Sequence, residues 1–400
     1  MIARLTALIC LTISLVSCHK SSSELFVLEG QVENLKDSTT IELAYYSMIN
    51  NKWQRTIDSA IVIDGKFRFE GEIEELTAAQ LYFPDNAAAR IYMEPTKMEL
   101  WIDRNAPYAY KLSGTKVEVE NRDLRKYTGP LDKNIFQNLT STLNEIKQYN
   151  LLKENAPDRD SLKNVINNHL AEINIYRGAK DSVLYNFISQ HPSYQIAPDL
   201  LYLLLEQGTF DVDTIKPIYN ILPTPIKNSL TGKFTADKIK EEENKKNSSV
   251  GGIAPDFTRE SSSGKSIRLS DFRNKNYVLL DFWASWCIPC LKEIPNVKKL
   301  YGKYQSKGLE VIGVSLDDDK SSWLKAVNKQ NLHEWPQILS KEQEDKSVFE
   351  KDDLSEIYNF DGIPFYILID KNGKVIERWE HIGEEQQLIL SNIFEPISSN

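Results

Sequence analysis

The chain has 400 residues, a hydrophobic share of 41% and a formal net charge of −9 at pH 7. This negative charge argues against nucleic acid and anionic lipid as partners. The apolar content, which includes seven tryptophans, is sufficient for folded cores and excludes an intrinsically disordered chain. The length predicts two or three domains.

The first residues, MIARLTALICLTISLVSC, have the pattern of a targeting segment. Arg4 precedes an uncharged apolar stretch from Leu5 to Val16, which is shorter than the roughly 20 residues of a membrane-spanning helix. The stretch ends in Leu-Val-Ser-Cys18, which resembles a bacterial lipobox. An ordinary secretory signal followed by a chance cysteine is the alternative interpretation.

The lipobox interpretation makes residues 1–17 a lipoprotein signal peptide and Cys18 the lipidated first residue of the mature chain. Residues 18–23 would form a polar tether, and the protein would face the periplasm from a bacterial membrane. Because no second long apolar run follows, lipid at Cys18 is the expected membrane attachment.

Residues 24–120 have the pattern of an all-β domain with a sandwich-like fold. Short runs rich in β-branched and aromatic residues alternate with turn formers, and Asp64-Gly65 predicts a hairpin between IVI and KFRF. Phe67 and Phe69 alternate with polar residues, as a strand with one buried face requires. No catalytic or metal-binding spacing occurs here, so a structural or docking module is the expectation.

Residues 121–249 change to a helical period and end in a linker. The apolar positions of two helices recur at spacings of three and four, namely Ile135, Leu139, Leu143 and Ile146, and then Leu162, Val165, Ile166, Leu170 and Ile173. DLLYLLLEQ predicts a buried helix, and KIKEEENKKNSSVGG predicts a linker or an exposed helix end. His169 and His191 lack a second ligand at metal-binding spacing.

Residues 250–400 alternate strand and helix and predict an α/β domain. YVLLDFWA has the continuous apolar pattern of a central strand, and LEVIGVSL predicts a second strand after an intervening helix. FYILID and VIERWE predict a hairpin joined at Asn372-Gly373, and EEQQLILSNIF predicts a closing helix.

The four cysteines indicate chemistry at a single site. Cys10 would leave with the signal peptide and Cys18 would carry lipid, so Cys287 and Cys290 of WCIPC would be the only thiols of the mature chain. A loop this short constrains the unfolded chain little, which argues against a structural disulfide. A zinc half-site is a further alternative, but the five histidines show no paired spacing that would complete it.

A cysteine at the start of a helix is activated for disulfide exchange. Unsatisfied N–H groups and the positive end of the helix dipole lower the pKa of Cys287 below the usual value of about 8.5. Pro289 suits the first helical turn. We therefore expect Cys287 to attack a substrate disulfide and Cys290, one turn further on and more buried, to resolve the mixed disulfide.

This segment resembles the thioredoxin superfamily, and specifically its TlpA-like, membrane-tethered thiol–disulfide oxidoreductases, over roughly residues 250–398. The resemblance rests on FWASWCIPCLKEIP, on IYNFDGIPFYILIDKNGKV, and on a leading hairpin in GGIAPDFTRESSSGKSIRLSDFRNK. It implies that Pro364 is a cis-proline facing the CxxC pair. It further implies that the backbone of Ile363 pairs with a substrate strand and that Trp286 flanks the site.

Two acidic residues are candidates for proton transfer. By resemblance, Asp281 matches the buried aspartate of thioredoxins that accepts the proton of the second cysteine. Glu293 matches an acid beside the site in cytochrome-maturation members, although those members usually lack an acid at the strand position. A charge on the helix surface is the alternative interpretation of Glu293.

The resemblance implies no cofactor and no metal. It implies protein disulfides as substrates and a membrane protein that passes on electrons from thioredoxin as the reductant, with cytochrome c maturation as one process. Peroxide chemistry does not fit, because Leu280 and Ala284 replace the proline and the Thr or Ser that it requires. A lipid-anchored binding or scaffold protein with an accessory thioredoxin-like domain is the alternative function.

Overall fold

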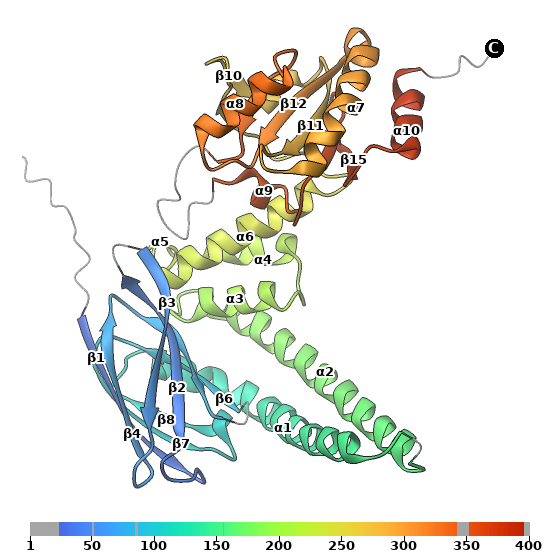
Figure 1. Cartoon of the computed structure of the whole chain (residues 1–400). Helices are drawn as coiled ribbons and strands as arrows, with labels where there is room; N and C mark the ends of the chain where they lie inside the picture. The colour runs from blue at the N-terminus through green and yellow to red at the C-terminus, as the bar shows by residue number, and fades with distance from the viewer. Residues whose placement is uncertain (1–23, 50–51, 85–86, 155, 342–351, 396–400) are drawn as a thin grey trace, which may run out of the picture.

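The computed structural model describes residues 24–49, 52–84, 87–154, 156–341 and 352–395. Figure 1 shows a β-domain and a long helical hairpin at one end of the molecule, a group of short helices in the middle, and an α/β domain at the other end. The fold class expected from the sequence is confirmed in all three parts: a thioredoxin-like C-terminal domain, N-terminal β-sheets and a helical middle region.

Two four-stranded sheets form the N-terminal domain. The first has the order β4-β1-β7-β8 and consists of Glu24–Glu33 (β1), Lys66–Ile73 (β4), Lys97–Asp103 (β7) and Lys111–Ser113 (β8). The second has the order β3-β2-β5-β6 and consists of Thr40–Ile49 (β2), Lys52–Ile61 (β3), Thr77–Tyr82 (β5) and Ala88–Met93 (β6). Alternate residues of both sheets share one buried core, as in a sandwich.

The turn at Asp64-Gly65 forms as predicted, but it does not close a simple hairpin. Both residues have positive φ, and Ile63 and Lys66 exchange two backbone hydrogen bonds of 2.9 Å. The flanking strands then separate, since β3 pairs with β2 whereas β4 pairs with β1. The hairpin expectation is therefore wrong beyond the turn itself, because each strand finds a longer partner in a different sheet.

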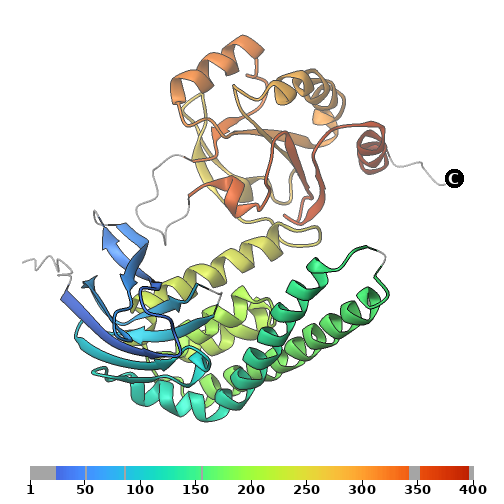
Figure 2. The same cartoon turned by 60° about the horizontal axis from the view of Figure 1, so that its bottom comes forward.

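Six helices follow the β-domain. They are Glu118–Leu151 (α1), Arg159–Gln190 (α2), Ala197–Glu206 (α3), Val212–Ile221 (α4), Thr224–Lys227 (α5) and Leu230–Ser248 (α6). The long helices α1 and α2 run side by side and project away from the rest of the chain (Figures 1 and 2). Because no third layer of described residues covers the distal part of this hairpin (Figure 1), Val165 and Leu170 of the predicted apolar stripes are exposed.

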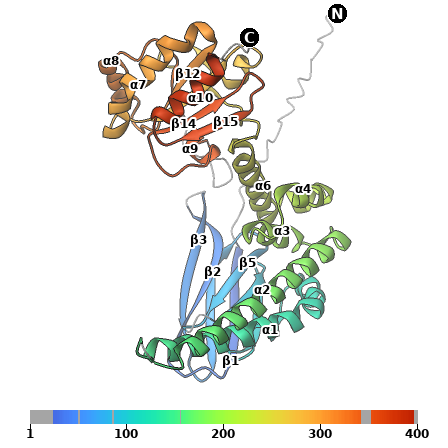
Figure 3. The same cartoon turned by 90° about the vertical axis from the view of Figure 1, so that its right-hand side faces the viewer.

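Helix α6 connects the two halves of the molecule and includes most of the predicted linker. The Glu75 carboxylate of the β-domain accepts the backbone N–H of Leu230 at the start of α6 (2.8 Å). Arg378 of the C-terminal domain donates to the carbonyl oxygen of Ser248 at its end (2.7 Å). Figure 3 shows α6 between the two domains, so the charged segment is a bridging helix with both ends tied down.

A five-stranded sheet of order β13-β12-β11-β14-β15 forms the centre of the C-terminal domain. Its strands are Tyr277–Trp283 (β11), Leu309–Ser315 (β12), Gln337–Leu339 (β13), Phe365–Ile369 (β14) and Val375–Trp379 (β15). The surrounding elements are a small hairpin, Thr258–Glu260 (β9) and Ser266–Arg268 (β10), and the helices Ile288–Tyr304 (α7), Lys320–Gln330 (α8), Leu354–Ile357 (α9) and Glu384–Phe394 (α10). Separate apolar clusters cover the two faces of the sheet, which accounts for the continuous apolar pattern of β11.

Candidate active site

The CxxC pair lies where the central strand β11 passes into helix α7. Cys287 is the N-cap residue of α7, and Pro289 occupies its first turn, where a missing N–H is not needed. Cys287 and Cys290 form a disulfide. The strand-to-helix junction therefore brings both sulfur atoms together at the positive end of the helix.

The two cysteines differ in their contacts rather than in burial. The Cys287 Sγ accepts the backbone N–H of Cys290 at 3.2 Å and lies 3.8 Å from the carbonyl oxygen of Ile363. The two residues are 4% and 3% exposed, so the expected difference in burial is too small to distinguish them. The side chain of Cys287 closes the start of the helix as its N-cap, whereas Cys290 already lies within the first turn. Of the two sulfur atoms, only that of Cys287 accepts a backbone N–H among the described residues.

The Ile363–Pro364 peptide bond is cis, as expected from the resemblance. It directly precedes strand β14, so the carbonyl group of Ile363 is held beside the Cys287 sulfur. The Ile363 side chain is partly buried and packs against the core cluster that contains both cysteines. Because β14 runs antiparallel to β11, the loop before β14 and the start of α7 lie at the same end of the sheet and meet at the disulfide.

Two exposed apolar side chains flank the disulfide. Trp286 is 63% exposed and Ile288 is 65% exposed, although they adjoin the buried Cys287 in the chain. Trp283, by contrast, is buried and donates from its indole nitrogen to Gln337 (3.1 Å). Trp286 and Ile288 form an apolar contact surface beside a reactive pair. Ile288 was not predicted, although its place between the two cysteines is a sufficient signal.

Asp281 is buried in the middle of β11 and is 6% exposed. Alternation along the strand places it on the same face as Leu279 and Trp283, which pack in one cluster with the two cysteines. Burial raises the pKa of Asp281 to about 7, and the negative charge of Glu293 adds to the rise. A carboxyl group with this pKa can both take and release a proton near neutral pH.

Glu293 lies half-buried on α7 and accepts a hydrogen bond from Asn296 (3.0 Å). Its charge acts on the buried Asp281, so the helix places it near the site. Tyr366 was not predicted as a part of the site. It pairs with Asp281 across the β11–β14 ladder, and burial, together with the charges of Asp281 and Glu293, raises its pKa well above the ordinary value. Tyr366 is therefore a neutral phenol beside two acids.

Asp317 holds the turn that carries the cysteines, and sequence analysis missed it. Its carboxylate accepts the backbone N–H of Ser285 (2.8 Å), the hydroxyl of Ser285 (2.5 Å) and the hydroxyl of Ser315 (2.6 Å). Asp317 is buried at the end of β12, and Ser285 lies two residues before Cys287. Asp317 follows the buried strand β12, which is parallel to β11, and the carboxyl ends of parallel neighbours lie side by side. This position is the signal from which its contact with the turn after β11 could have been predicted.

Replacing Asp317 by alanine should lower the free energy of unfolding by about 2–4 kcal/mol, because three donors lose their partner in a largely buried place. Urea denaturation of the oxidised protein measures the change. Asp318→Ala is the matched control, since Asp318 is the exposed neighbour, and its effect should stay within about 0.5 kcal/mol. Equal stability of the two variants would show that Asp317 does not hold this turn.

The structure thus gathers Cys287, Cys290, Asp281, Glu293, Trp286, Ile363 and Pro364 in one region of the C-terminal domain. Cys18, the predicted lipidation site, lies outside the described residues. Within the described ranges, no group of three or more His, Cys, Asp or Glu side chains is arranged to hold a metal ion.

Comparisons with known proteins place similarities at both ends of the chain. The model of the AhpC/TSA family matches residues 250–395, which include the cysteine pair, and the model of a domain of unknown function, DUF4369, matches residues 26–121. Thiol-disulfide oxidoreductase ResA of Bacillus thuringiensis (strain Al Hakam) is 34% identical over 165 residues, which are 41% of this chain and 84% of the relative.

A second relative and a solved structure have similar sequence identities to this chain. Thiol-disulfide oxidoreductase ResA of Geobacillus kaustophilus is 36% identical over 126 residues, which are 32% of this chain and 66% of the relative. The solved thioredoxin domain of a thiol-disulfide oxidoreductase from Bacteroides vulgatus is 33% identical, covers 37% of this chain and 99% of that chain, and has a TM-score of 0.33.

Proposed function

The chain belongs to the family of ResA-like thiol-disulfide oxidoreductases, and we propose that it reduces protein disulfides with Cys287 as the attacking thiol and Cys290 as the resolving thiol. The contacts of Cys287 are the main support. Its sulfur caps α7, accepts the N–H of Cys290, and lies beside the carbonyl oxygen of Ile363 next to the cis-proline.

The proposed reaction starts from the reduced pair. The Cys287 thiolate attacks one sulfur of a substrate disulfide, a mixed disulfide forms, and the other substrate sulfur leaves as a thiolate. Cys290 then loses its proton and attacks the Cys287 sulfur, which releases the second substrate thiolate. The substrate gains two electrons and the protein ends with the Cys287–Cys290 disulfide, the state seen in the structure.

Asp281 is proposed to take the proton of Cys290 in the second step. Its pKa of about 7 gives it a usable basic form near neutral pH, and strand alternation turns it toward the face that carries the cysteines. Glu293 is proposed to assist by raising the pKa of Asp281. Tyr366, which keeps its proton, is not proposed to act as a base.

Substrate contact is proposed at the apolar rim and at the loop before β14. Trp286 and Ile288 offer exposed apolar surface, and the backbone of Ile363 in this loop offers hydrogen-bonding groups for an extended substrate segment. Pro289, which precedes the second cysteine, favours the reducing direction by resemblance to reducing members of the superfamily. Oxidised cytochrome c precursors are one proposed substrate class. A membrane protein that receives electrons from thioredoxin is the proposed reductant.

Reduction of a model disulfide tests this function. The protein from residue 24 onward, supplied with dithiothreitol, should accelerate the reduction of insulin disulfides well above the rate with dithiothreitol alone. The precipitation of the reduced insulin B chain follows the reaction. A rate equal to the background would contradict the proposal.

The protein is further proposed to be anchored by lipid at Cys18 and to face the periplasm. Among the described residues, no helix is long and apolar enough to cross a membrane. Because Cys18 is the cysteine of the lipobox-like sequence, its replacement by alanine should abolish lipidation and move the protein from the membrane fraction to a soluble or unprocessed form. Labelling with a radioactive fatty acid and fractionation of the cells measure both effects. Wild-type protein in the soluble periplasmic fraction would contradict the anchor.

A further inference from the structure

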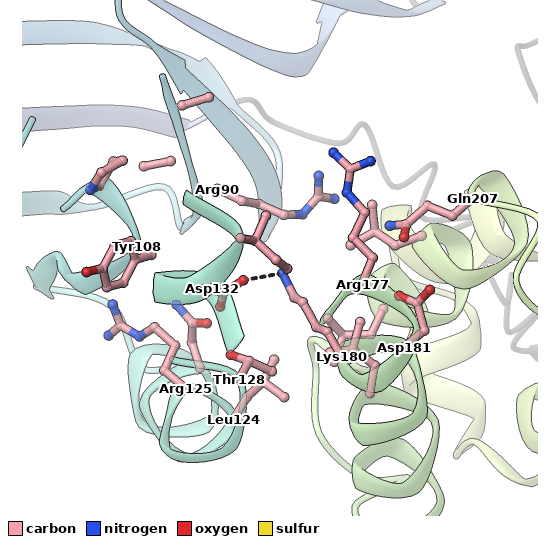
Figure 4. Close-up of a pocket in the computed structure, with 18 of the residues that line it drawn as sticks. Arg90, Tyr108, Leu124, Arg125, Thr128, Asp132, Arg177, Lys180, Asp181 and Gln207 are labelled. Atoms are coloured by element: carbon pink, nitrogen blue, oxygen red, sulfur yellow. Dashed lines mark hydrogen bonds and ion pairs between the residues drawn. The ribbon is translucent and has the colours of Figure 1, made fainter. Parts of the chain in front are cut away.

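A cavity of about 790 Å³ lies between the β-domain and the helical region. The proposed redox reaction gives neither of these parts a role. The cavity opens between strand β6 of the β-domain and helices α1, α2 and α3, and Figure 4 shows the side chains that line it. Its volume falls within the range of about 300–1,000 Å³ that is common for small-molecule sites. The cavity belongs to a different domain from the cysteine pair.

The helical or strand repeat of each element decides which of its side chains face the cavity. On α1, Leu124, Thr128 and Asp132 recur every four residues and line the same side. On α2, Arg177 and Asp181 do the same. On β6, alternation turns Ile91 into the sandwich core and Arg90 outward toward the helices, where it lines the cavity.

Most of the charged groups in the walls are held by fixed partners. Arg90 donates from two nitrogens to the carboxylate of Asp199 on α3, and the Tyr92 hydroxyl donates to the same carboxylate (2.6 Å). Lys180 of α2 pairs with Asp132 of α1 at 2.6 Å. These bonds tie β6 to α3 and α1 to α2, so the cavity walls are fixed in place.

Two polar groups of the walls have no partner among the described residues. Arg177 lies exposed at the rim of the cavity and forms no hydrogen bond or ion pair there, so its five N–H donors face solvent. The hydroxyl of Thr128 likewise has no hydrogen bond, although Thr128 is only 3% exposed. Thr128 lines the cavity, so its hydroxyl is open to a hydrogen bond with a ligand or water there.

The uncommitted groups favour a negatively charged ligand. Four cations line the cavity, and three of them bind a carboxylate: Arg90 binds Asp199, Arg125 binds Glu118 and Lys180 binds Asp132. Among the described residues, no carboxylate binds the fourth cation, Arg177. In Figure 4 the guanidinium groups of Arg90 and Arg177 point toward the same region, beside Gln207. Asp132 already binds Lys180, and Asp181 already accepts the hydroxyl of Thr209 (2.5 Å). Donors therefore remain in excess.

We propose that this cavity binds a small organic anion, with its carboxylate or phosphate group on Arg177 and a polar group on the Thr128 hydroxyl. Guanidinium groups pair with both acids in a bidentate manner. The site is separate from the cysteine pair, so the proposal stands independently of the redox function.

Isothermal titration calorimetry of the protein from residue 24 onward, at low ionic strength, tests this site with three probes. Citrate represents carboxylates, pyrophosphate represents phosphates, and sucrose is the neutral probe of similar size. We expect at least one anion to bind, sucrose not to bind, and added salt to weaken the binding. The tighter anion identifies the acid group. Absence of binding by both anions, or equal binding of sucrose, would overturn the proposal.

Two pairs of variants locate the site. Arg177→Gln should weaken anion binding by about 10- to 100-fold, because it removes a charge-assisted contact. Arg122→Gln, on an exposed arginine of α1 outside the cavity, should leave the affinity unchanged. Unchanged binding in Arg177→Gln would overturn the proposal.

A steric pair gives a second, independent test. Gly178 lines the cavity and Gly129 does not, and a Cβ atom at either helix position meets nothing within 4 Å. Gly178→Leu should fill part of the cavity and block binding, whereas Gly129→Leu should not. Both variants should keep the wild-type rate of disulfide reduction and the wild-type melting temperature within a few degrees. Binding that survives in Gly178→Leu would place the anion elsewhere and overturn the proposal.

Discussion

Replacing Cys287 by alanine is expected to abolish disulfide reduction, with a loss of about 1,000-fold or more, down to the rate with dithiothreitol alone. The reason is that Cys287 is the sulfur that accepts the N–H of Cys290 and lies beside Ile363, where a substrate strand would be held. Cys290 has no equivalent contact with this loop. The insulin assay measures the loss.

Replacing Cys290 by serine is the matched control, because it should block only the second step. Attack by Cys287 should persist, and mixed disulfides should accumulate that dithiothreitol releases, which non-reducing gels of cell extracts would show. Circular dichroism should confirm that both variants are folded. Activity that survives in Cys287→Ala, or mixed disulfides that form without Cys287, would remove the proposed role.

Replacing Asp281 by asparagine should slow the resolution step about 10-fold or more and leave the attack by Cys287 largely intact. Asparagine keeps the shape of the side chain but cannot accept the proton of Cys290. In the wild type, the rate of resolution should rise as the pH increases through about 7, the pKa of Asp281. In the variant this rise should move toward about 8.5, where a free thiol ionises without help. Stopped-flow mixing measures both steps.

Equal slowing of both steps, or of neither, would assign the proton transfer to another group. Glu293→Gln is the informative comparison, because the Glu293 charge contributes to the raised pKa of Asp281. Removing that charge should lower the pKa of Asp281 and move the rise in the rate of resolution to lower pH. If Glu293 were itself the base, Glu293→Gln would abolish the rise instead.

The raised pKa of Asp281 also predicts how stability depends on pH. The folded-state pKa of about 7 lies above the ordinary value of 3.8. The contribution of this group to stability is therefore full below pH 3.8 and is lost as the pH rises through 7, which amounts to about 4 kcal/mol. Asparagine does not titrate. The stability of Asp281→Asn relative to wild type should thus increase by about 3 kcal/mol from pH 5 to pH 8 in urea denaturation of the oxidised protein.

The local patterns of the sequence were sufficient for the fold class and for the place of the cysteine pair at the start of α7. Alternation identified the buried face of β4 through Phe67 and Phe69, and both side chains are buried. The cis-proline at Pro364 was expected from the resemblance of a short motif, and that peptide bond is cis. Each of these features depends on residues close together in the chain, so the sequence shows them directly.

Other features depend on which distant segments meet. The turn at Asp64-Gly65 forms locally, but long-range pairing sends its two strands to different sheets. Tyr366 reaches Asp281 only through the register of β11 with β14, and Asp317 reaches Ser285 only because β12 lies beside β11. The periodicity within one strand or helix does not show which distant strand will lie beside it, or in which register.

The sequence by itself therefore determined the alternation of strands and helices, the cysteine pair at the start of a helix and the acid in the central strand. Only the tertiary structure decided that the two cysteines are equally buried, that the charged segment after α5 is part of a bridging helix, and that Arg177 and Thr128 face one cavity. The physical reason is that secondary structure and the first turn of a helix arise from neighbours in the chain, whereas burial, pKa and cavities arise from packing between elements that are distant in sequence.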